Sequence, residues 1–100
     1  MDDRLPEREI LGQRRADILR VATMHGASRV RVFRSVARGD ARADSDLDLL
    51  VDLEPGRSLL DLIAIKQDLE DLLLRPVDVV TEAAISSYVR ADILREAVPL

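Results

Sequence analysis

Residues 45–53 read SDLDLLVDL and place two aspartates, Asp46 and Asp48, two positions apart at the start of an apolar run. Alternation along an extended chain puts both carboxylates on one face of a sheet, and Leu47 and Leu49 then point to the other face. Neighbouring carboxylates repel each other unless a cation lies between them, and hard oxygen ligands favour Mg²⁺. The same alternation is typical of any half-exposed strand, so this spacing also fits a purely structural interpretation.

A third aspartate strengthens the metal-site interpretation. Asp78 lies inside the short apolar run VDVV at residues 77–80, where an acidic residue is unusual. If strands 47–53 and 77–80 pair, the three carboxylates converge on one site. Three converging acids suit a two-metal phosphoryl-type displacement, in which one carboxylate can take a proton from the attacking hydroxyl.

Further elements are predicted around these strands. Apolar positions at helical spacing indicate a helix over about 7–25, and Gly26 suits the position after its last turn. Alternating β-branched residues indicate a strand over 30–33. A final helix is expected over 84–97, with Pro99 closing it. The order helix, strand, strand, helix, strand, helix predicts a small α/β sheet domain.

Between the second and third strands, Ser58 and Asp61 have the spacing of a capping box that opens a helix ending near Leu73. This helix is predicted to bury one apolar stripe, formed by Leu59, Leu62, Ile63, Leu69 and Leu73. Other apolar residues widen that surface beyond what a small sheet covers, which indicates a homo-oligomer or partner contact: Leu60, Ile65 and Leu72.

Length and composition limit the function classes. One hundred residues predict a single domain over 1–100, and the absence of cysteine excludes disulfide, zinc-thiolate and thiol-nucleophile chemistry. A net charge of −4 and only two aromatic residues argue against direct nucleic-acid binding. Because no apolar run approaches the roughly 20 residues of a membrane span, we expect no membrane association and a cytoplasmic location.

The residues after the first strand can contact phosphate. A strand running into a short helical turn offers backbone N–H groups, Ser35 adds a hydroxyl donor, and Arg38 adds a guanidinium. Taken singly, Ser35 also fits a helix N-cap and Arg38 a surface ion pair.

Together, the stretches VFRSVARG at 32–39 and SDLDLLV at 45–51 resemble the nucleotidyltransferase superfamily related to DNA polymerase β. The signature of that family is Gly-Ser, a spacer and Asp-x-Asp, and here ten residues separate Ser35 from Asp46. The short chain is similar to the minimal nucleotidyltransferases, the antitoxin halves of HEPN/MNT toxin–antitoxin pairs. The resemblance implies the nucleotidyltransferase fold, a small mixed sheet flanked by helices.

The resemblance also implies roles for individual residues. Ser35 and Arg38 would bind the nucleotide, Asp46 and Asp48 would hold two Mg²⁺ ions, and Asp78 would be the third carboxylate of the catalytic and metal site. The substrate would be ATP. The reaction would transfer AMP to a tyrosine of a HEPN ribonuclease toxin and silence it.

One position departs from the family pattern, because Arg34 stands where the family has glycine before the serine. Glycine lets the backbone approach phosphates with no Cβ in the way, and we expect arginine to impair catalysis sterically. The alternative is that its charge folds over a phosphate and assists.

Two function classes therefore remain open. The first is a Mg²⁺-dependent protein adenylyltransferase, and the second is a catalytically impaired antitoxin that neutralises its partner by binding alone. A small-molecule nucleotidyltransferase is a third possibility, although such enzymes carry a further helical domain for the acceptor.

Overall fold

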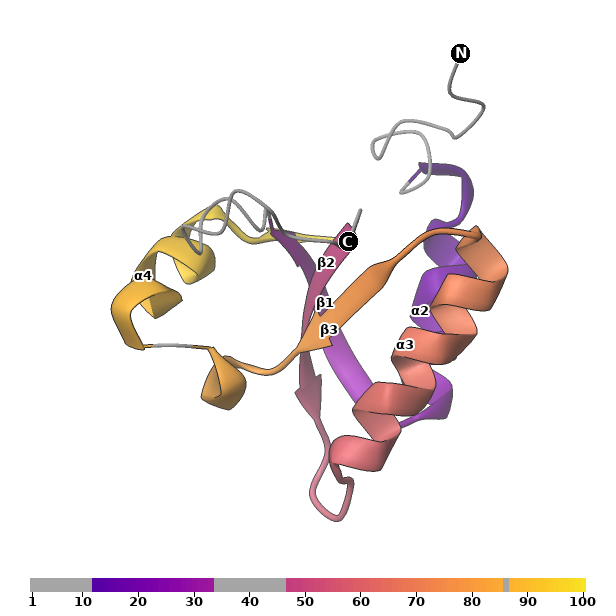
Figure 1. Ribbon diagram of the computed structural model, residues 1–100, viewed down its shortest axis with the longest axis horizontal. Helices are drawn as coiled ribbons and strands as arrows, with labels where there is room; N and C mark the ends of the chain where they lie inside the picture. Colours follow the sequence, from indigo (N-terminus) through magenta and orange to yellow (C-terminus); the bar gives the residue numbers. More distant parts are fainter. Residues whose placement is uncertain (1–11, 34–46, 86) are drawn as a thin grey trace.

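The computed structural model of this chain describes residues 12–33, 47–85 and 87–100 (Figure 1). Four predicted site positions, Arg34, Ser35, Arg38 and Asp46, lie outside the described residues. The elements follow in this order: α2 (Arg15–Met24), β1 (Ala27–Phe33), β2 (Leu47–Leu53), α3 (Leu59–Leu73), β3 (Val77–Val80), η2 (Glu82–Ala84), α4 (Ser87–Glu96) and β4 (Val98–Pro99).

The four strands form one mixed sheet in the order β3-β2-β1-β4. Strand β1 runs antiparallel to β2 and to β4, whereas β2 and β3 are parallel. Parallel neighbours need a crossover connection, and α3 supplies it. The predicted mixed sheet flanked by helices is thereby confirmed, together with the pairing of the two aspartate-bearing strands.

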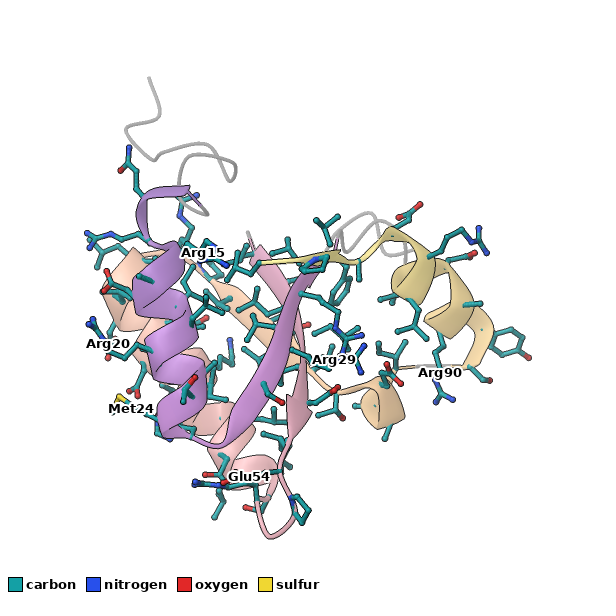
Figure 2. All side chains as sticks on the ribbon, turned by 180° about the vertical axis from the view of Figure 1, so that it is seen from behind. Arg15, Arg20, Met24, Arg29, Glu54 and Arg90 are labelled. Carbon is teal, nitrogen blue, oxygen red and sulfur yellow. The ribbon has the colours of Figure 1, made fainter. Side chains whose placement is uncertain are left out.

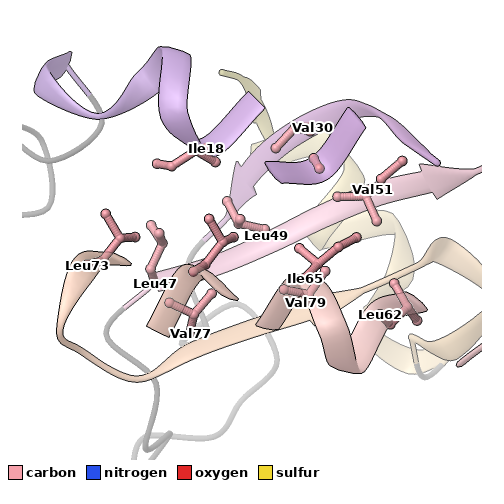
Figure 3. Close-up of a cluster of buried hydrophobic side chains, with 13 residues drawn as sticks. Ile18, Val30, Leu47, Leu49, Val51, Leu62, Ile65, Leu73, Val77 and Val79 are labelled. Atoms are coloured by element: carbon pink, nitrogen blue, oxygen red, sulfur yellow. The ribbon is translucent and has the colours of Figure 1, made fainter. Parts of the chain in front are cut away.

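Helices cover the two faces of the sheet unequally. Figure 1 shows α2 and α3 side by side on one face and α4 on the opposite side of the strands. On the first face the side chains of Ile18, Leu49 and Ile65 meet between helices and strands (Figure 3). Each of these three is at most 1% exposed. This face holds the larger part of the hydrophobic core, which leaves the α4 face less filled by apolar side chains.

The α4 face carries a smaller apolar cluster. Its buried members are Phe33 of β1, Leu50 of β2, Ile85 after η2, and Ile93 of α4. Asp48 and Asp78 belong to this face, because Leu47, Leu49 and Val77 point to the α2/α3 core, as alternation requires. The helix α4 therefore packs over the same sheet face that carries the acids.

Strand β1 begins at Ala27, three residues before the predicted start at residue 30. Its register with β2 shifts between Ser28 and Arg31, and Arg29 adopts a positive φ of 47°. This bulge adds one residue to the strand. As a result, Ala27 and Val30 both face the α2/α3 core, and Arg31 and Phe33 face α4.

The predicted capping box of α3 is confirmed. The Ser58 hydroxyl accepts from the Leu60 N–H at 3.2 Å, and the Asp61 carboxylate accepts from the Ser58 N–H at 2.9 Å. The prediction of the buried stripe is wrong at Leu59 and Ile63, which are 69% and 41% exposed. The fully buried Ile65 takes their place, because the helix is rotated so that this residue faces the sheet.

Helix ends differ from prediction elsewhere. Helix α2 runs from Arg15 to Met24, and a bend at Arg14 separates it from the helical residues 12–13. Gly26 follows α2 with φ of 78°, as expected for the residue after the last turn. A Cβ at Gly26 would also lie against the Arg57 side chain, which would have to shift to make room. The part of the predicted helix at residues 7–11 lies outside the described chain.

The C-terminal segment differs most. The predicted helix over 84–97 is shorter, because residues 82–84 form the separate 3₁₀ turn η2 and α4 begins at Ser87. The helix ends at Glu96, before Pro99, and Val98 and Pro99 pair with β1 as strand β4, which the sequence did not predict. No helix in the described part of the chain is long and apolar enough to cross a membrane.

Candidate functional site

Two of the three predicted carboxylates lie side by side. Asp48 and Asp78 are direct partners in the parallel ladder of β2 and β3, and Phe33 is the partner of Asp48 on β1. Directly opposed residues of neighbouring strands project to the same face, with strands about 4.8 Å apart. Phe33, Asp48 and Asp78 therefore form a row across the sheet, and we call the two aspartates of this row the acid row.

The row is only partly open to solvent. Asp48 is 4% exposed, whereas Asp78 is half-buried. Carboxylate oxygens at adjacent ladder positions are the hard donor set that Mg²⁺ prefers, so the described residues fit this ion. Within the described ranges no group of three or more histidine, cysteine or acidic residues is placed to hold a metal. The predicted third member, Asp46, falls outside them.

The ends of two strands adjoin the sequence that carries the other predicted residues. Strand β1 ends at Phe33, directly before Arg34, and β2 begins at Leu47, directly after Asp46. Their ends are adjacent in the antiparallel pair, where Phe33 is the partner of Asp48. The nucleotide-binding roles of Ser35 and Arg38 remain predictions.

A buried arginine on the same face was not predicted from the sequence. Arg31 is 8% exposed, and its guanidinium donates to Asp52 at 3.0 Å, to Glu82 at 3.4 Å and to the carbonyl of Arg29 at 3.1 Å. These contacts tie β1 to β2 and to η2. The bulge at Arg29 turns Arg31 onto this face, and nothing in the residue pattern at 27–33 indicates such a bulge.

The connection from η2 to α4 is held by a second arginine. Arg90 donates from its terminal nitrogen to the Ile85 carbonyl at 3.1 Å, and Figure 2 shows its side chain reaching from α4 toward η2. The Nε atom of Arg90 is buried with no hydrogen-bond partner in the described structure. Arg31 and Arg90 thus fix the segment between β3 and the helix that covers the acid row.

A third unpredicted feature lies at the outer edge of β3. Lys66 of α3 donates to the Val77 carbonyl at 2.8 Å, and the Val77 N–H donates to Glu70 at 2.9 Å. Lys66 and Glu70 also pair with each other at 2.8 Å. The hydrogen bond from Lys66 and then that from Val77 hold the pKa of the Glu70 carboxyl below its usual value. In the sequence, Lys66 and Glu70 show only an i,i+4 spacing, which is typical of ion pairs on exposed helix surfaces and does not indicate a contact with a strand.

Comparisons with known proteins identify the family of the chain. The family model for the nucleotidyltransferase domain matches residues 18–100. MJ0435 of Methanocaldococcus jannaschii, named as a candidate protein adenylyltransferase, is 41% identical over 81 residues, which cover 81% of this chain and 87% of that protein. The protein adenylyltransferase MntA of Thermococcus cleftensis is 42% identical over 73 residues, covering 73% and 74% of the two chains.

Solved structures match the fold. A structure described as a candidate minimal nucleotidyltransferase superposes with a TM-score of 0.74 at 54% identity, covering 92% of this chain and 94% of that one. A toxin–antitoxin crystal structure with AMP-PNP superposes with a TM-score of 0.60 at 18% identity, covering 87% and 69%, which is a likeness of fold alone. The chain belongs to the nucleotidyltransferase domain family and is a transferase of the minimal nucleotidyltransferase type.

Proposed function

We propose that this protein is a Mg²⁺-dependent protein adenylyltransferase that acts as an antitoxin, transferring AMP from ATP to a tyrosine of a HEPN ribonuclease toxin. The observation that carries the proposal is the pairing of Asp48 with Asp78 on the sheet face beneath α4. Adjacent carboxylates offer the hard oxygen donors that Mg²⁺ prefers, and in nucleotidyl transfer such a cation stabilises the charge of the phosphates.

The proposed reaction is a single displacement at the α-phosphorus of ATP. The acceptor hydroxyl oxygen forms a bond to that phosphorus, the bond to pyrophosphate breaks, and the hydroxyl proton passes to a carboxylate, for which Asp78 is the candidate. Asp46 and Asp48 would hold Mg²⁺, which neutralises charge on the phosphates when bound. Ser35 and Arg38 would orient the phosphates.

The names of similar proteins support the protein acceptor and the antitoxin role. MntA of Thermococcus cleftensis is named a protein adenylyltransferase, and the structural neighbour with AMP-PNP is described as a toxin–antitoxin. AMP-PNP is an ATP analogue, which supports ATP as the substrate here. The HEPN class of the toxin and the tyrosine acceptor rest on the family resemblance.

One residue favours a second candidate function. Arg34 stands where the family signature has glycine, and a side chain at a tight phosphate turn is expected to hinder the nucleotide. A protein with such a hindered site would still silence its toxin by binding alone. The intact acids Asp46, Asp48 and Asp78 favour the enzyme.

Substitution of Arg34 by glycine separates these functions. The proposed HEPN toxin is incubated with ATP, Mg²⁺ and either version, and its mass is measured. If Arg34 hinders the site, the Arg34→Gly variant should transfer AMP faster, by up to about 10²-fold, with unchanged affinity for the toxin.

The other outcomes are equally informative. A wild-type protein that already transfers AMP and is slowed by Arg34→Gly would show that the guanidinium assists the phosphates. If neither version adds mass to the toxin while both silence it, the adenylyltransferase proposal is wrong and binding alone is the function.

A further inference from the structure

The strand that carries Asp78 is short and lies at the edge of the sheet. Strand β3 has four residues, and among the described strands, in the order β3-β2-β1-β4, it meets another strand on its inner side alone. The ladder to β2 fixes that inner side and sets Asp78 beside Asp48. An edge strand of this length has few main-chain bonds of its own, so its position depends on what holds the outer side.

Helix α3 holds the outer side through two side chains. The N–H and the carbonyl of one residue point to the same side of a strand, and both groups of Val77 are bound by α3, to Glu70 at 2.9 Å and to Lys66 at 2.8 Å. The 2.8 Å bond between Lys66 and Glu70 closes the arrangement into a ring around Val77. We call Lys66 and Glu70 the α3 clip.

The clip acts directly on the backbone next to Asp78. The Val77 carbonyl belongs to the peptide group that joins Val77 to Asp78, and a peptide group is planar, so fixing its oxygen fixes the orientation of the Asp78 nitrogen. The clip from α3 and the ladder from β2 therefore hold this peptide from opposite sides. Lys66 is the only lysine of the chain, which leaves no second ammonium to replace it.

We propose that Lys66 and Glu70 are positioning residues that set the Asp78 carboxylate at the distance from Asp48 required for metal-dependent nucleotide binding. The inference rests on the proposed function, since it assigns the pair a role in that same site. Residues that orient a metal ligand from outside the coordination shell affect metal affinity strongly even though they touch neither metal nor substrate.

The test compares ATP binding with and without metal in the free protein. Lys66→Met removes both hydrogen bonds of the ammonium while keeping an unbranched side chain. We expect the Kd for ATP in Mg²⁺ to rise about tenfold, the lower end for lost outer-shell support, while the Kd for ATP in EDTA stays unchanged. Lys66→Arg, which retains donors, should recover most of the loss.

A second readout needs no ligand. Amide hydrogen exchange of residues 77–80 in the free protein should accelerate in Lys66→Met, because one side of the strand is released. The matched control is Arg20→Met, which removes an ion pair of α2 with Asp17 but no bond to a strand. This control should leave both Kd values and the exchange of 77–80 unchanged.

If the clip were only structural, Lys66→Met would lower the melting temperature but leave the Kd for ATP in Mg²⁺ unchanged at temperatures where the protein is folded. That result would overturn the inference. Should Lys66→Met fail to fold, Glu70→Gln, which keeps an acceptor for the Val77 N–H, must show the same metal-dependent loss on a smaller scale or the inference is wrong. A wild-type protein that shows no difference in ATP binding between Mg²⁺ and EDTA overturns the proposed metal site, and the role of the clip with it.

Discussion

Leu74 ends α3 in a backbone conformation that usually belongs to glycine. Its φ of 56° and ψ of 42° are left-handed, and its side chain is 81% exposed. A side chain in this region costs about 1–2 kcal/mol, and exposed leucine recovers little of that cost by burial. The strain lies four residues after Glu70 and three before Val77, in the connection that leads α3 into β3.

Glycine at position 74 should therefore stabilise the protein. We expect Leu74→Gly to raise the free energy of unfolding by about 1 kcal/mol, the relief of strain less the added entropy of the unfolded chain. Urea denaturation measures the change. Leu74→Ala is the control, because it loses the same exposed side chain but keeps a Cβ; equal stability of the two variants would contradict the explanation.

Single residues also show what the sequence could and could not predict about the site. Asp48 and Asp78 were found because an acid inside an apolar strand has a recognisable cost. Arg31 was missed because its burial depends on the bulge at Arg29. An arginine gives no indication that its backbone will adopt the positive φ of this bulge. Lys66 and Glu70 were missed because their spacing is that of any exposed helix pair.

At the scale of elements, predictions succeeded where the signals are local. The bounds of β2 and β3 and the start of α3 follow from apolar runs and a capping box. The start of β1 and the strand β4 could not be predicted, because a bulge breaks the alternation of β1 and β4 is only two residues that include a proline. Both depend on pairing with a strand distant in sequence.

The contact between α3 and β3 gives a pH-dependent prediction. The pKa of Glu70 is lowered from 4.5 by Lys66 and the Val77 N–H, so its folded value lies below its unfolded value. A lowered carboxyl pKa adds stability that is fully present above the unfolded pKa and is lost as pH falls through the folded pKa.

The free energy of unfolding should therefore be compared between the wild-type protein and Glu70→Gln across pH. Since both side chains of the pair are partly exposed, we expect a difference of at most about 1 kcal/mol at neutral pH. The difference should be constant above pH 4.5 and shrink below it. A difference that stays the same at acidic pH would show that the charge of Glu70 contributes nothing.

At the scale of the whole molecule, the two sheet faces have separate tasks. The α2/α3 face holds most of the apolar core, and the α4 face combines a small apolar cluster with the acid row and the Arg31 network. The fold and the family could be predicted because the aspartate motif and the strand pattern are local and strong. Of the residues predicted to form an oligomer or partner contact, Leu60 is exposed, whereas Ile65 is buried and Leu72 packs against the α2/α3 core. The prediction is therefore wrong for Ile65, and the contact itself stays a prediction.

The central claim is that the acid row of β2 and β3 binds ATP through Mg²⁺, and thermal unfolding with Mg²⁺ and ATP tests it most directly. At a ligand concentration of about 100 times Kd, the wild-type protein should gain about 2.7 kcal/mol, a rise of roughly 10 °C or more in Tm for a chain of this size. Asp48→Asn and Asp78→Asn preserve side-chain shape, so each variant should still fold and unfold cooperatively. Each should nevertheless lose both the rise in Tm with Mg²⁺ and ATP and the transfer of AMP. The same rise in Tm in the wild-type protein and in both variants would contradict the account.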